Sequence, residues 1–72
     1  MNALVRMTGP HAGAASVNGR PRPAWRVAVI STQDRQPRTK VYSCLSYHRA
    51  VSLSCHMAHD RKLHLHMDAL PR

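Results

Sequence analysis

Residues 25–32, Trp-Arg-Val-Ala-Val-Ile-Ser-Thr, carry the clearest secondary-structure signal in the chain. Side chains of an extended strand alternate between its two faces, so this stretch places Trp25, Val27 and Val29 together and the intervening residues opposite them. The alternation predicts a β-strand, and the rest of the chain is interpreted outward from it.

A second strand is predicted over residues 41–47, where β-branched, aromatic and small polar residues alternate. Residues 33–38, Gln-Asp-Arg-Gln-Pro-Arg, interrupt the pattern, so the two strands indicate a β-hairpin over about 25–47. The connecting loop lacks the Asn-Gly or Asp-Gly pair that fixes hairpin register. Because two strands alone are marginal in water, we expect a weak hairpin.

Residues 49–69 contain no proline or glycine and include several good helix formers, which predicts a C-terminal α-helix over about that range. Their apolar residues do not keep to one helical face, so the predicted helix is marginal. Within it, residues 63–67, Leu-His-Leu-His-Met, alternate as a strand does.

Residues 1–24 are predicted to be a flexible basic arm rich in proline, glycine and alanine. The breaking residues within it are Gly9, Pro10, Gly13, Gly19, Pro21 and Pro23. The chain therefore divides into an arm at 1–24 and a marginally structured hairpin and helix at 25–72.

Composition predicts a largely disordered small chain. The chain has six Leu, six Val, one Ile and no Phe, and its net charge is +8. This fraction of large apolar residues is below the ~20% under which a highly charged chain is typically disordered. Eleven Lys and Arg face three Asp and no Glu, so most cations would repel one another in a compact state.

The first residues offer no apolar run of the ~7–15 residues typical of a secretory signal, and no segment approaches the ~18 apolar residues of a membrane span. We therefore expect an intracellular chain, in the cytoplasm or nucleus, with reduced cysteines. An alternative is mitochondrial targeting, because the first 33 residues carry four arginines and no acid.

Both cysteines and five of the six histidines lie between residues 44 and 66. On one continuous helix, most of these would form a stripe about 60° wide, but Cys44 and His59 would be about 22 Å apart along it. Four-coordinate zinc would then need a bend or a second chain. No cofactor is predicted to be required, and a metal-ordered module binding zinc is an alternative. Its candidate ligands are Cys44, His48, Cys55, His59, His64 and His66.

The first forty residues hold seven cations and one acid, a distribution that suits electrostatic binding of nucleic acid or another polyanion. The candidate polyanion-binding residues are Arg20, Arg22, Arg26, Arg35, Arg38 and Lys40. We therefore predict a basic microprotein that acts by binding.

Two further interpretations belong to other classes. Trp25, Val27 and Val29 would be the contacts of a protein-interaction segment if the 25–30 strand joined a partner's sheet. A translated open reading frame without a refined molecular function is the other alternative. An enzyme is not predicted, since Glu is absent and the three Asp are dispersed.

Overall fold

A computed structural model describes residues 3–33 and 36–71, without the side chains of residues 32–37. It contains four strands and one helix. In chain order these are β1 (Ala3–Val17), β2 (Arg20–Gln33), β3 (Gln36–Cys44), α1 (Tyr47–Arg61) and β4 (His64–Ala69).

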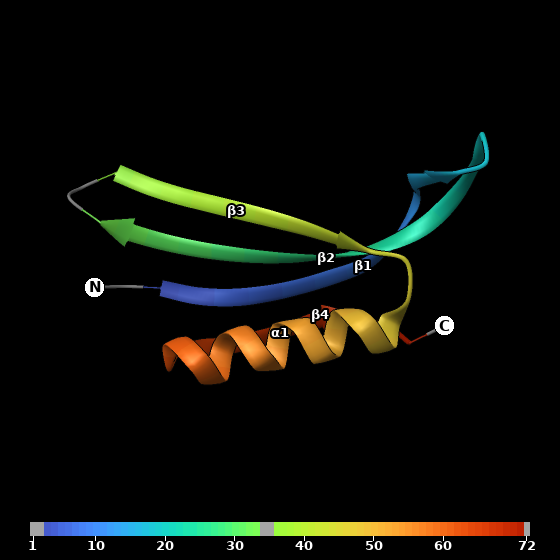
Figure 1. Cartoon of the computed structure of the whole chain (residues 1–72). Coiled ribbons are helices and arrows are strands. Elements are labelled where there is room, and N and C mark those ends of the chain that lie inside the picture. Colours follow the sequence, from blue (N-terminus) through green and yellow to red (C-terminus); the bar gives the residue numbers. More distant parts are fainter. Residues whose placement is uncertain (1–2, 34–35, 72) are drawn as a thin grey trace.

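The strands form one mixed sheet in the order β3-β2-β1-β4. β1 pairs with β2 and β2 with β3 in antiparallel ladders, whereas β4 lies parallel to β1. A parallel strand needs a crossover connection, and α1 supplies it between the two edge strands β3 and β4. Figure 1 shows α1 running beneath the sheet, with β4 partly behind it.

The helix packs on the sheet through small side chains. Ala50, Ser54 and Ala58, four residues apart, are buried along one side of α1. The Ser54 hydroxyl donates to the Val51 carbonyl at 3.0 Å and lies 3.7 Å from the sulfur of Met7. Small residues let α1 approach the sheet closely, so larger sheet residues fill the interface. The buried sheet residues are Val5, Met7, Ala24, Trp25, Val27 and Val29.

Trp25 joins three segments that are distant in sequence. Its indole Nε1–H donates to the Leu70 carbonyl at 3.0 Å, just beyond β4. Its ring packs edge-on against Tyr47, the first residue of α1, with 6.3 Å between centroids. Leu70 in turn donates its backbone N–H to the Gly9 carbonyl at 3.0 Å. We call Gly9, Trp25, Tyr47 and Leu70 the tryptophan junction.

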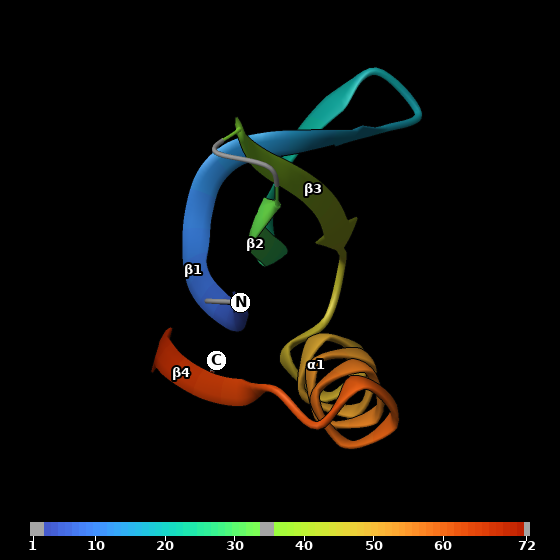
Figure 2. The same cartoon turned by 90° about the vertical axis from the view of Figure 1, so that its left-hand side faces the viewer.

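The predicted flexible arm is ordered strand instead. Residues 3–17 form β1, which pairs with β2 on one side and β4 on the other. The β1–β2 pairing shifts register between Thr8 and His11, which accommodates Gly9 and Pro10 within the strand. A second register shift lies between His11 and Ala15. Figure 2 shows the resulting bend of β1, beyond which the β1–β2 hairpin projects from the sheet.

The helix ends eight residues before the predicted boundary. Ser46 caps its start by accepting the Arg49 backbone N–H at 3.1 Å. At the other end Lys62 adopts the left-handed conformation, with φ 53°, and its N–H bonds the carbonyls of Ala58 and His59. The chain then turns, and the alternating residues 64–69 become β4.

The prediction of a largely disordered chain is therefore wrong. Buried apolar residues of β1 and β2 alternate onto the face that α1 covers, so a small number of them builds a continuous core between sheet and helix. The weak hairpin predicted at 25–47 is also corrected: β2 begins earlier, at Arg20, and β3 spans Gln36–Cys44, starting within the predicted loop and ending three residues before the predicted strand does. The two strands form the middle and one edge of a larger sheet.

Gly9→Ala should destabilise the fold by about 2–4 kcal/mol, combining overpacking with an unfavourable backbone angle. A Cβ at this position would lie 2.9 Å from Cδ1 and 3.0 Å from Cα of Trp25, and φ is +134°. Urea unfolding followed by circular dichroism measures the change. Gly19→Ala is the control, because its φ is also positive, at +77°, but its added Cβ meets nothing within 4 Å. Equal losses in the two variants would contradict the close packing at the junction.

Candidate functional site: a basic hollow at one end of the sheet

Three cationic side chains meet around a hollow of about 380 Å³ at the end of the sheet where β2 passes to β3. Arg38 and Lys40 come from β3, and Arg61 is the last residue of α1. The remaining lining residues are Val29, Ser31 and Thr39. We call this the basic hollow.

Strand register explains how the cations come together. Lys40 pairs with Val29 and Arg38 with Ser31, and the Val29 side chain is buried toward α1. Cross-strand partners share a face, so both cations lie on the side of the sheet that the helix covers. Since α1 ends there, Arg61 completes the group.

The electrostatics of the basic hollow favour an anion. None of its described lining residues is acidic, so the three cations repel one another and no carboxylate among those residues neutralises them. The Ser31 hydroxyl adds a neutral hydrogen-bond donor. Guanidinium and ammonium groups with a hydroxyl are the donors that bind phosphate oxygens.

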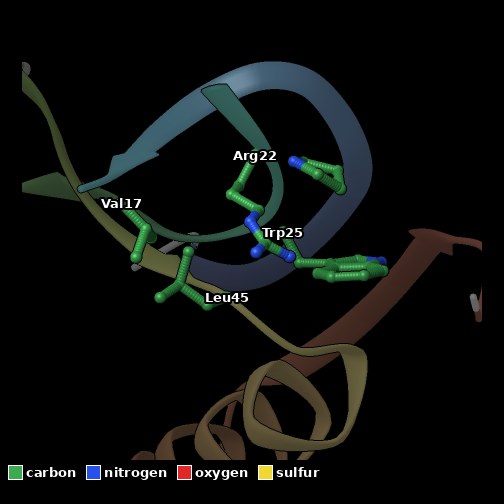
Figure 3. A pocket seen from close by; sticks show the side chains of 5 residues that line it. Val17, Arg22, Trp25 and Leu45 are labelled. Carbon is green, nitrogen blue, oxygen red and sulfur yellow. The ribbon is translucent and has the colours of Figure 1, made fainter. Parts of the chain in front are cut away.

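A second hollow, of about 260 Å³, lies where the β1–β2 hairpin leaves the sheet. It is lined by Val17, Arg22, Pro23, Trp25 and Leu45, and we call it the hairpin hollow. Figure 3 shows Val17 and Arg22 of the hairpin and Leu45 of the segment after β3, with the indole of Trp25 extending away from Val17 and Leu45. Its lining is mainly apolar with one cation, so it differs in chemistry from the basic hollow.

The outer face of the sheet, away from α1, has a third hollow of about 310 Å³ lined by Leu4, Arg6, Ile30, His66 and Asp68. Arg6 and Asp68 form an exposed ion pair there, with 3.0 Å between nitrogen and oxygen. Exposed pairs of this kind stabilise a fold by about 0–1 kcal/mol, so its effect is to join β4 to β1 weakly.

The fold divides the predicted polyanion-binding residues among separate places. Arg38 and Lys40 line the basic hollow, whereas Arg20 and Arg22 lie on the projecting hairpin. Arg26 is exposed on the outer face between Thr8 and Ser43, and Arg35 lies outside the described residues. The sequence does not identify Arg61 as a member of this group, because the helix it predicts continues to residue 69 and places Arg61 in the helix interior.

The candidate metal ligands do not share one helical stripe, because α1 covers only part of the 44–66 stretch. Cys44 ends β3, and only His48, Cys55 and His59 belong to the helix. His64 and His66 lie on β4. Across residues 3–33 and 36–71, no three His, Cys, Asp or Glu residues gather in a group able to hold a metal ion. The structure therefore gives no support to the description of the chain as metal-capable.

Trp25, Val27 and Val29, the candidate protein-interaction residues, face α1 and are buried in the core. Residues 26–31 of β2 are paired on both sides, by β1 and by β3, so this part of the strand has no free edge. Addition of β2 to a partner's sheet would require one of these ladders to open.

Comparison of the chain with protein-family models, with curated proteins and with solved structures gave no match. Its helix, α1, is neither long nor apolar enough to cross a bilayer, and this holds for the whole described part of the chain.

Repulsion within the basic hollow predicts that Lys40→Gln stabilises the fold by about 0.3 kcal/mol at low salt. The gain should vanish near 1 M salt, where the Debye length is about 3 Å. Urea unfolding at the two salt concentrations measures the effect. Arg20→Gln, on the hairpin, is the control with the same charge change and should alter stability less. A loss of stability in Lys40→Gln at low salt would show that Lys40 is held by favourable contacts.

Proposed function

We propose that this protein binds nucleic acid through electrostatic contacts, and that the basic hollow holds backbone phosphate. The observation that carries the proposal is the meeting of Arg38, Lys40 and Arg61 around one space, with no acid among the described lining residues. These three cations come from two separate elements, and their mutual repulsion is relieved when an anion enters.

The arrangement of the other cations favours a long polyanion over a small one. Arg20 pairs with Val17 near the hairpin tip, and Ser31, beside Arg38, lies eleven residues further along β2. At ~3.3 Å per residue, the two basic regions are about 35 Å apart along the strand. Each strand of a nucleic acid duplex carries one phosphate per ~3.4 Å, so about ten base pairs would span both regions, and an extended single strand would span them with fewer nucleotides.

We propose binding and not catalysis because of where the described carboxylates lie. Asp68 is paired with Arg6, and Asp60 lies 3.1 Å from His56 on the exposed side of α1. Neither carboxylate lines the basic hollow or the hairpin hollow. General acid–base chemistry needs such a group within hydrogen-bond reach of the bound substrate.

Binding of a fluorescent single-stranded oligonucleotide of about 12 nucleotides, followed by anisotropy, tests the proposal. If about three to five phosphates are neutralised, affinity should fall about 20- to 100-fold between 50 and 200 mM salt. Arg61→Gln should weaken binding several-fold and reduce the slope of log K against log salt by about 0.7.

Arg49→Gln provides the matched control, because Arg49 is exposed on α1, carries the same charge and does not line the basic hollow. It should weaken binding less than Arg61→Gln does. Affinity that does not change with salt would contradict the proposal. Equally effective competition by polyglutamate would point to an acidic protein as the partner.

A further inference from the structure

We propose that the hairpin hollow accepts one unpaired nucleobase, which makes single-stranded nucleic acid the preferred partner. This inference rests on the proposed function and adds the class of nucleic acid to it. The basic hollow recognises charge, which every polyanion carries. The hairpin hollow offers the different chemistry that distinguishes a base from a phosphate.

The walls of the hairpin hollow suit a flat, largely apolar group. Val17, Pro23 and Leu45 supply aliphatic surface, and Leu45 is 56% exposed although it is a large hydrophobic residue. At about 260 Å³ the space is below the ~300–1,000 Å³ typical of pockets for drug-sized ligands. It therefore fits a single ring system.

The cations beside the hairpin hollow match the parts of a nucleotide. Arg22 lines the hollow itself, and a guanidinium plane stacks on nucleobases. Arg20 is the cross-strand partner of Val17, which places it at the rim of the same hollow. When a base lies against the apolar walls, Arg22 can stack on its ring and Arg20 can bind an adjoining phosphate.

Trp25, one of the lining residues, is 3% exposed, so it is a fixed support of the hollow and not a free stacking surface. The hydrogen bond to Leu70 and the edge-on contact with Tyr47 fix its orientation. A support ordered in advance reduces the ordering cost of binding.

Duplex nucleic acid does not meet the requirements of the hairpin hollow. Each base of a duplex is stacked above and below, and turning it outward costs a few kcal/mol. An unpaired base in a single strand is free of most of that cost. We therefore expect a single strand to use both hollows and a duplex to use the cations alone.

Anisotropy with three labelled probes of about 12 nucleotides tests the inference: a single strand, a duplex, and a strand of abasic sites with the same number of phosphates. The single strand should bind about tenfold more tightly than the abasic strand, equivalent to about 1.4 kcal/mol. The duplex should bind more weakly than the single strand.

Leu45→Asn should bring the single-strand affinity to within about twofold of the abasic affinity and leave abasic binding unchanged. Val41→Asn is the control, because Val41 is also an exposed apolar residue, at 55%, and lines neither the hairpin hollow nor the basic hollow. It should leave all three affinities unchanged. Circular dichroism confirms that each variant is folded.

The outcomes separate the inference from the function on which it rests. Equal, salt-dependent binding of the single strand and the abasic strand would overturn the inference and leave the proposed function intact. Tighter binding of the duplex would overturn it in the same way. Failure of all three probes to bind would overturn both.

Discussion

The fold depends on the contacts of a single indole. Trp25 sits in the central strand β2, packs against Gly9 of β1, touches Tyr47 at the start of α1 and donates to Leu70 beyond β4. Because Leu70 also bonds the Gly9 carbonyl, strands, helix and C-terminal segment are fixed to one another at this point. A chain with so few large apolar residues needs such a junction, since small domains bury only ~60% of their unfolded surface.

The hairpin hollow adjoins that junction, because Trp25 is one of its lining residues. The basic hollow lies at the other end of α1, where the left-handed conformation of Lys62 ends the helix and Arg61 meets Arg38 and Lys40. Among its described lining residues the basic hollow has three cations and no acid, and we interpret their expected mutual repulsion as the cost of an anion site.

The sequence predicts the central strand well and its surroundings poorly. Alternation over residues 25–30 identifies both β2 and its buried face, because period-two patterning reports directly on a half-buried strand. The sequence does not predict β1, because Gly9 and Pro10 are typical of loops. The register shift that accommodates them is seen only in the pairing with β2. Arg38 and Lys40 are predictable as cations, but their meeting with Arg61 depends on where α1 ends, which Lys62 decides through a conformation more typical of glycine.

Hydrogen exchange of the single tryptophan indole, read from a ¹H–¹⁵N NMR spectrum, tests the central claim most directly. The chain has one Trp, so the indole N–H gives one assignable signal. With the Nε1–H bonded to Leu70 and the ring 3% exposed, we expect slow exchange together with well-dispersed amide signals. An indole that exchanges at the rate of free tryptophan, in a spectrum whose amides crowd into the random-coil range, would contradict the account.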